Sequence, residues 1–289
     1  MIYTLQNEFL TVKISDLGAE LQSIADAEGR ERLWQGDEAF WGERAPFMFP
    51  FCGRVWNGLV TANGVPCKID LHGFFRHRLT EAQQVSSTEI SFVQADGEDT
   101  LADYPFHFRV RITYLLEGNR ITVRGEVTNT GDRVMPYGFG AHPGFCAPFD
   151  GGCFEDYYVE FPHASGARAL CFDENNCFLI GGTKDFPMRD GVRFDLTDDF
   201  FATGSSFLCD MPEEVTLKND RSNHYLKLRY AGIPYLGLWK VPGADYVCIE
   251  PWCSLPAYSG ESTELYEKED LCRVAPGMTD LHEFSIEIG

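Results

Sequence analysis

Residues 108–128 read FRVRITYLLEGNRITVRGEVT, and this stretch decides the fold class. On both sides of a central Glu-Gly-Asn, apolar residues alternate with charged or polar ones. A period of two places one face of a β-strand in a core and the other face in water. A glycine-containing turn between two such runs is typical of a hairpin. The stretch therefore predicts two long, half-buried antiparallel strands.

The same alternation recurs over much of the chain, at residues 9–15, 89–93, 226–230 and 283–288. One short acidic segment, residues 261–270, is the only one that favours a helix. No composition break, low-complexity tract or repeat of roughly 20–50 residues divides the chain. We therefore expect an all-β protein, a large antiparallel β-sandwich, that forms one domain over residues 1–289.

The composition is that of a globular protein, with 44% hydrophobic and 24% charged residues and a net charge of -20. Nucleic-acid phosphates require a basic face, so this charge argues against a nucleic-acid partner. It argues more weakly against an anionic membrane, and it disfavours a phosphorylated substrate without excluding one. Since no run approaches the ~18 apolar residues of a membrane span, we expect no membrane partner.

Cysteine usage indicates a reducing compartment. The chain has ten cysteines but no Cys-x-x-Cys pair. Its first residues, MIYTLQ, lack the basic and apolar regions of a signal peptide. We expect free thiols, no metal site, because zinc needs clustered ligands, and a cytoplasmic location.

A carboxylate follows an apolar run in residues 245–252, DYVCIEPW. Because proline has no N–H to donate, the strand is expected to stop at Pro251, which leaves Glu250 at its end beside Trp252. A partly buried carboxylate has a raised pKa and can accept a proton near neutral pH. The alternative interpretation is a salt-bridged structural glutamate.

A histidine lies among glycines and aromatics in residues 137–145, YGFGAHPGF. Histidine is the side chain best suited to exchange a proton at neutral pH. His142 and Glu250 would make an acid and base pair if the fold brings them together. The alternative is a histidine with a structural role only.

Two irregular segments, residues 40–63 and 142–152, have the length of functional loops. The first contains Arg54, whose donors suit paired hydroxyls or a carboxylate. Residues 70–78, DLHGFFRHR, follow with two histidines and two arginines. A surface arginine and a solvated basic turn are the alternatives for these two features.

Four short motifs occur in order along the chain: Gly53-Arg54, Leu71-His72-Gly73, His142-Pro143 and Ile249-Glu250-Pro251-Trp252. Together they resemble the aldose 1-epimerase (galactose mutarotase) family, and within it the LacX-like branch. The resemblance spans nearly the whole chain and implies a galactose mutarotase-like supersandwich. It also implies a cofactor-free interconversion of the α and β anomers of a free aldose.

The resemblance assigns roles to individual residues. Glu250 matches the catalytic base of the family and His142 its general acid. Arg54 and His72 match residues that hold the sugar. The pattern departs from the family where a sugar-binding aspartate is expected, because residues 200–208, FFATGSSFL, offer Thr203 or Gly204 instead. Arg76 resembles an arginine of the hexose-6-phosphate epimerases, where such residues hold the phosphate.

The chemistry follows from the reaction itself. Opening a hemiacetal removes a proton from the C1 hydroxyl and delivers one to the ring oxygen, which an ionised Glu250 and a protonated His142 can do. The nearby carboxylate is expected to favour charged His142. Trp252, Trp239 and Phe145 are candidates to pack on the apolar face of the sugar, or else are core aromatics.

Three functions remain open on the sequence. The first is a mutarotase for a small-molecule sugar. The second is a hexose-6-phosphate 1-epimerase, which needs a convergent cationic pocket of Arg54, Arg76 and Arg78. The third is a non-catalytic carbohydrate-binding or sugar-sensing protein. The presence of both Glu250 and His142 favours catalysis, and the net acidity favours the free sugar.

Overall fold

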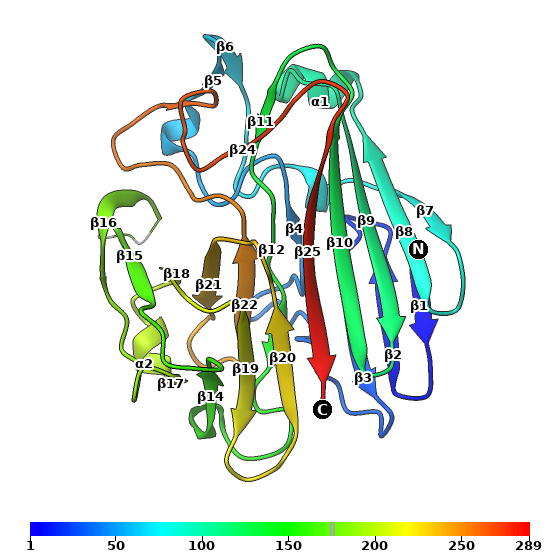
Figure 1. Ribbon diagram of the computed structural model, residues 1–289, viewed down its shortest axis with the longest axis vertical. Coiled ribbons are helices and arrows are strands. Elements are labelled where there is room, and N and C mark those ends of the chain that lie inside the picture. The colour runs from blue at the N-terminus through cyan, green and yellow to red at the C-terminus, as the bar shows by residue number, and fades with distance from the viewer. Residues whose placement is uncertain (174, 176) are drawn as a thin grey trace.

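Two large antiparallel sheets form a β-sandwich in the computed structural model, which describes residues 1–173, 175 and 177–289 (Figure 1). The first sheet has nine strands, in the order β17 (Arg193–Asp195), β14 (Tyr157–Glu160), β19 (Glu214–Asn219), β20 (Tyr225–Arg229), β25 (Thr279–Ile288), β10 (Arg120–Asn129), β9 (Phe108–Glu117), β8 (Glu89–Ala95) and β7 (Glu81–Gln84).

The second sheet carries Glu250 and Trp252 on one of its strands. It has eight strands, in the order β16 (Leu179–Asp185), β15 (Arg168–Phe172), β18 (Ser206–Cys209), β21 (Tyr235–Trp239), β22 (Tyr246–Trp252), β12 (Gly140–Ala141) and β4 (Phe47–Met48), with β13 (Gly144–Cys146) also paired to β22. Strand β22 is central and buried along its whole length.

Three small sheets complete the fold. They contain β1 (Ile2–Gln6), β2 (Leu10–Ser15) and β3 (Leu21–Asp26); β11 (Met135–Tyr137) and β24 (Cys272–Val274); and β23 (Thr263–Glu264), β5 (Val60–Ala62) and β6 (Val65–Cys67). Strands β5 and β23 pair in parallel, whereas the other strand pairs of the described residues are antiparallel. The short helical segments are α1 (Glu98–Asp103), α2 (Asp198–Phe201), η1 (Trp56–Gly58), η2 (Phe75–His77) and η3 (Phe154–Asp156).

The predicted hairpin at residues 108–128 is confirmed. It forms β9 and β10, which pair in register from Arg120 opposite Glu117 to Asn129 opposite Phe108. The apolar positions are buried and the charged ones face outward, as the alternation predicts. One hydrophobic cluster includes residues from β1 to β25, which favours the single domain that the sequence predicts.

The predicted helix at residues 261–270 is wrong. This segment pairs with β5 through β23 and then turns, and the Leu265 N–H donates to the Thr61 carbonyl. The Glu264 carboxylate accepts hydrogen bonds from the Thr61 hydroxyl and the Asn63 N–H. A neighbouring strand and loop therefore satisfy the groups of this segment, and two apolar residues alone do not make a helix face.

The predicted strand end at Pro251 is also wrong, because β22 continues through Pro251 to Trp252. The N–H groups two residues before and after it, at Ile249 and Cys253, donate to Pro143 and Phe139. The missing N–H of Pro251 therefore falls on the side where β12 and β13 are interrupted, away from β21. No ladder hydrogen bond is lost there, so proline is tolerated in a central strand.

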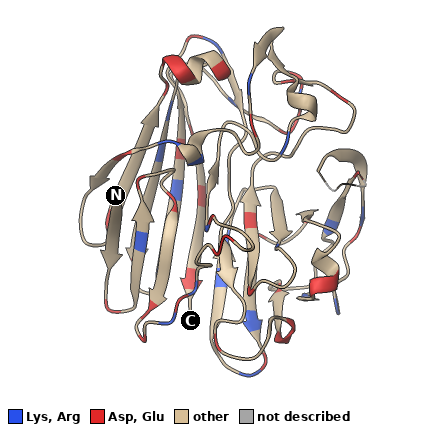
Figure 2. Cartoon of the chain, turned by 180° about the vertical axis from the view of Figure 1, so that it is seen from behind, with Lys and Arg blue, Asp and Glu red and all other residues tan. Residues whose placement is uncertain are grey.

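Acidic residues are spread over strands, loops and short helices and are interspersed with Lys and Arg (Figure 2). The negative charge is therefore distributed along the chain. Among the helices of the described residues, none has the length and apolarity needed to cross a membrane.

Candidate active site

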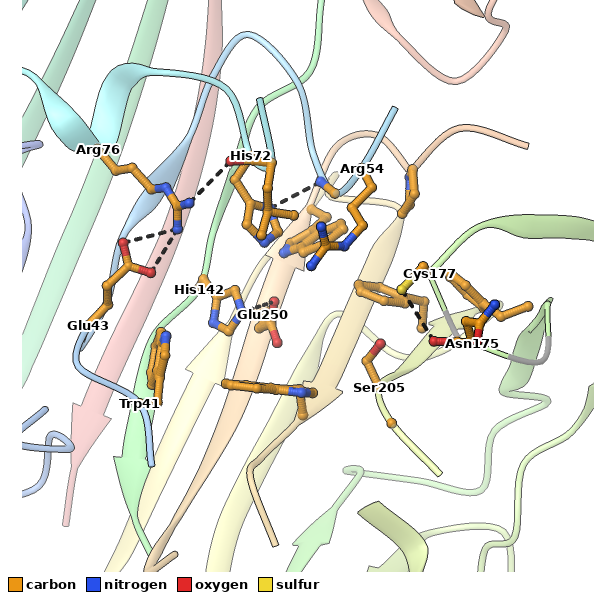
Figure 3. A pocket seen from close by; sticks show the side chains of 18 residues that line it. Trp41, Glu43, Arg54, His72, Arg76, His142, Asn175, Cys177, Ser205 and Glu250 are labelled. Carbon is orange, nitrogen blue, oxygen red and sulfur yellow. Dashed lines mark hydrogen bonds and ion pairs between the residues drawn. The ribbon is translucent and has the colours of Figure 1, made fainter. Parts of the chain in front are cut away.

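A cleft of about 480 Å³ opens over β22 and the two strands beside it (Figure 3). Its polar lining includes residues of β22, of the segment between β3 and β5, and of η2 with the turn before it. The lining residues are Trp41, Glu43, Gly53, Arg54, Leu71, His72, Arg76, His142, Phe172, Asn175, Cys177, Gly204, Ser205, Phe207, Trp239, Glu250, Trp252 and Pro256. The cleft therefore brings together the predicted acid and base, Glu250 and His142, and the predicted sugar-binding residues Arg54, His72, Arg76 and Trp252.

Glu250 lies at the bottom of this cleft. Its side chain points from the middle of β22 and is only 1% exposed. Directly across the β21–β22 ladder stands Gly237. A Cβ on Gly237 would lie 3.1 Å from Glu250 Cβ and 2.9 Å from the Phe207 ring, so a glycine leaves room for the carboxylate.

His142 sits in the interruption between β12 and β13. Its backbone N–H donates to the Pro46 carbonyl, which anchors the residue outside a regular strand. Its Nε2 lies 3.3 Å from Glu250 Oε2. The rings of Trp41 and Trp239 pack against the imidazole with centroid distances of 4.9 and 5.5 Å. The fold therefore brings the acid and base candidates into direct contact.

Burial favours the neutral forms of both groups. It raises the pKa of Glu250 well above its usual value, and the Trp252 indole, which lies near the carboxylate without an aligned hydrogen bond, opposes this only in part. Burial also lowers the pKa of His142 to about 3, and the positive charge of Arg76 adds to this. Both shifts favour the neutral carboxyl and the neutral imidazole over the ion pair that we expected.

The floor of the cleft contains polar atoms that the protein does not satisfy. Within the described residues, both Glu250 carboxylate oxygens, His142 Nδ1 and Trp252 Nε1 are buried without a hydrogen-bond partner. Buried polar groups are normally paired, because an unpaired one costs about 1–3 kcal/mol. These atoms are therefore available to hydrogen-bond to a polar ligand or to water in the cleft.

His72 holds one wall of the cleft in a defined orientation. Its backbone adopts a positive φ of 63°, which is uncommon for a residue other than glycine. Its Nδ1 accepts a hydrogen bond from the Gly53 N–H at 3.1 Å. Burial, with the neighbouring His142 and arginines, lowers the pKa of His72 well below its usual value. The neutral ring therefore carries its hydrogen on Nε2, which remains able to donate.

Arg54 and Trp252 lie on the same side of the cleft as His72. The Trp252 and His72 rings meet edge to face at 5.5 Å, and Phe207 packs on Trp252 at 4.3 Å. Arg54 is exposed, and its guanidinium makes no ion pair with the described residues. Arg54 is thus the cation in this cleft with its donors available to a ligand.

Arg76 lines the cleft but is already engaged. Its guanidinium donates to both Glu43 oxygens, at 3.0 and 2.7 Å, and to the Leu71 carbonyl at 3.2 Å. Arg78 does not line the cleft and pairs with Asp99. The three arginines required for a phosphate pocket therefore do not converge.

Of the other residues that the sequence predicted for the site, some line the cleft and others do not. Trp239 lines the cleft, but Phe145 is fully buried in the main core and does not. Gly204 lines the cleft whereas the Thr203 hydroxyl donates to Phe200 O. Sequence reasoning singled out none of Trp41, Glu43, Asn175, Cys177 and Ser205, which also line it. A signal existed for the first two, because they belong to the segment 40–63 that was predicted to be functional.

Comparison with known protein families identifies the family of this chain. The profile described as aldose 1-epimerase matches residues 1–224. The chain belongs to the aldose 1-epimerase family.

Relatives that match over their full length place the chain in the LacX branch of the family. The chain is 30% identical over 298 aligned residues to the chromosomal LacX protein of Lactococcus lactis subsp. lactis, covering 100% of this chain and 99% of the relative. A galactose mutarotase related enzyme of Lactobacillus acidophilus has a similar structure, with a TM-score of 0.93 and 31% identity over 100% of this chain and 97% of that one. A galactose mutarotase-like protein of Lactobacillus casei gives a TM-score of 0.94 at 27% identity, with both chains fully covered. The predicted supersandwich fold and LacX-like branch are confirmed.

Proposed function

We propose that the protein is an aldose 1-epimerase that interconverts the α and β anomers of a free aldohexose. The observation that carries this proposal is the contact of His142 Nε2 with Glu250 Oε2 at the bottom of a cleft, among buried polar atoms without partners in the described protein. The family relationship supports the reaction class.

The pair is suited to a reaction that moves two protons. Ring opening transfers the C1 hydroxyl proton to a base, breaks the bond between C1 and the ring oxygen, forms the C1 carbonyl and gives a proton to that oxygen. Glu250 and His142 hold one proton between them before and after this step. Rotation about C1–C2 and closure by the reverse transfers gives the other anomer. Each positioned group typically contributes ~10²–10⁴-fold.

The bound sugar changes which form of the pair is favoured. Its hydroxyls add hydrogen-bond donors to the carboxylate, beside the Trp252 indole that already lies near it. Hydrogen bonds to the charged form lower a carboxyl pKa. The proton then moves to His142 across their contact, which leaves Glu250 as the base for the C1 hydroxyl and His142 as the acid for the ring oxygen.

The lining favours a free sugar over a sugar phosphate. Trp252 and Trp239 offer aromatic surface to the apolar face of a pyranose, while Arg54 and His72 offer donors to its hydroxyls. Arg76 is neutralised by Glu43, so a phosphate group would meet little net positive charge.

Polarimetry tests the proposal. Freshly dissolved α-glucose and α-galactose should reach rotational equilibrium faster with the enzyme at catalytic concentration than in buffer containing an equal mass of an inert protein. A rate equal to the buffer rate for both sugars, and for further aldohexoses and aldopentoses, would reject the epimerase function.

A further inference from the structure

A second cluster of chemically reactive side chains lies outside the cleft. Cys253 follows β22, Cys272 begins β24 and His282 lies in β25. Their two Sγ atoms and one imidazole nitrogen all lie within 4.8 Å of one another. The sequence led us to expect cysteines too scattered for a metal site, and that premise is wrong because three separate segments converge here.

The imidazole of His282 is held with one nitrogen turned toward the thiols. Its Nδ1 lies 3.0 Å from Cys253 Sγ. Its Nε2 lies 2.7 Å from the Tyr137 hydroxyl, which itself donates to Asp280 at 2.9 Å. With the Tyr137 hydrogen given to Asp280, His282 Nε2 carries the hydrogen and Nδ1 keeps its lone pair.

Packing fixes the plane of this ring as well. Phe139 stacks on His282 with a centroid distance of 4.9 Å and an angle of 16°. Phe139 occupies the space above Gly125, the residue across the ladder from His282, where a Cβ would lie 2.4 Å from the Phe139 ring. A ligating histidine whose other nitrogen is bound by a hydrogen-bonded chain is typical of zinc centres.

The cluster matches the preferences of a thiophilic cation. Zinc binds thiolate and imidazole at ~2.0–2.3 Å in a tetrahedron, which spaces its ligand atoms ~3.5–4 Å apart. Cys253 Sγ and His282 Nδ1, which are 3.0 Å apart, would have to separate by about 0.5 Å, and Cys272 Sγ lies within 4.8 Å of both, so small side-chain shifts would let the three atoms surround an ion. We propose that Cys253, Cys272 and His282 form a binding site for a thiophilic divalent cation of the zinc type, with solvent as fourth ligand.

This site is separate from the catalytic pair. Cys253 belongs to the main hydrophobic cluster, whereas the preceding Trp252 packs in a different one and lines the cleft. An ion here would link the residue that follows β22 with strands β24 and β25. Chelation should therefore lower the melting temperature of the metal-loaded protein and leave its rate of anomerisation unchanged.

Cobalt provides a probe that reports thiolate ligation. Reduced, metal-free protein titrated with Co²⁺ should saturate at one equivalent, with a thiolate-to-cobalt absorption band in the near ultraviolet that Zn²⁺ abolishes. Cys272→Ser and His282→Gln should each prevent this saturation. Cys209→Ser, which changes a partly buried cysteine outside the cluster, is the matched control and should behave as the wild type.

A further variant separates this site from the cleft. His142, Cys248 and Glu250 form another group with ligand atoms within 4.8 Å. The band should survive in Cys248→Ser. Its loss there, its persistence in both Cys272→Ser and His282→Gln, or the absence of any binding by the wild type would each contradict the proposal.

Alkylation of the wild type tests the proposal without variants, which could fail to fold. Zn²⁺ should protect Cys253 and Cys272 from a thiol reagent, as mapped by mass spectrometry, while the exposed Cys153 stays reactive. Equal labelling with and without Zn²⁺ would contradict the proposal. So would a disulfide between Cys253 and Cys272 in freshly purified, unreduced protein, because it would consume both ligands.

Discussion

Gly237 stands directly across the ladder from Glu250, and a methyl group in its place would lie 3.1 Å from Glu250 Cβ and 3.2 Å from its carboxyl carbon. The carboxylate therefore owes its position to a missing side chain on the neighbouring strand. The same methyl group would lie 2.9 Å from the Phe207 ring. It can therefore be accommodated only if Glu250 or Phe207 moves.

Gly237→Ala should reduce kcat by up to about 10²-fold, because a shift of ~1 Å in a catalytic group can cost that much. Polarimetric kinetics, with a thermal melt to confirm folding, measures it. Gly166→Ala is the control, since a Cβ there meets nothing within 4 Å. Unchanged kcat in a folded Gly237→Ala protein would show that the position of Glu250 is not critical.

The pH profile tests the shared proton. If activity requires one proton on the pair, kcat/KM against pH should be bell-shaped, with values that belong to the pair. Burial lowers the pKa of His142 to about 3 and raises that of Glu250. The gain of a second proton thus occurs at low pH and the loss of the last one above the usual glutamate range, which gives a broad plateau.

Glu250→Gln leaves His142 as the single titrating member of the pair. The residual activity of this variant should therefore lose one limb of the bell and follow a single titration. A bell that persists with both limbs in Glu250→Gln would assign at least one of them to a group outside the pair.

Arg54 and His72 should contribute to sugar binding. Arg54→Ala removes a charged donor to the hydroxyls and should raise KM about tenfold or more. His72→Asn should act similarly, and asparagine tolerates the positive φ of this position. Arg78→Ala is the matched control, because Arg78 lies outside the cleft. An equal rise in KM for Arg54→Ala and Arg78→Ala would indicate general electrostatics instead of direct contact.

Substrate choice should follow the pairing of Arg76 with Glu43. The value of kcat/KM should be higher for glucose than for glucose 6-phosphate, because one free arginine is a weak phosphate site. Glu43→Gln releases Arg76 and should improve the ratio for the phosphate. Competition between the two sugars in one reaction measures this directly, and a preference of the wild type for the phosphate would contradict it.

Local patterns predicted much of the fold, because half-buried strands record burial in every second residue. The β9–β10 hairpin follows from such a pattern, whereas β22 was predicted from a continuous apolar run, which agrees with its burial along the whole strand. The helix predicted for the acidic segment around Glu264 was wrong, because the partners of this segment on β5 lie far away in the sequence.

The site was predicted in its residues but not in its electrostatics. His142 and Glu250 were recognisable from their motifs, yet their 3.3 Å contact depends on the fold, and the shift of both pKa values towards the neutral forms depends on their burial. The engagement of Arg76 by Glu43 likewise depends on a fold contact between separate loops. The convergence of Cys253 with Cys272 could not be foreseen from their spacing.

The central claim is that Glu250 and His142 open and close the sugar ring, and magnetisation exchange between the two anomeric protons of equilibrated glucose or galactose tests it most directly. Catalytic amounts of the wild type should speed this exchange above the buffer rate. Glu250→Gln keeps the shape of the side chain but removes the base. This variant should accelerate the exchange ~10²–10⁴-fold less than the wild type does. Exchange at the buffer rate with wild-type protein that nevertheless binds the sugar, or equal acceleration by Glu250→Gln, would contradict the account.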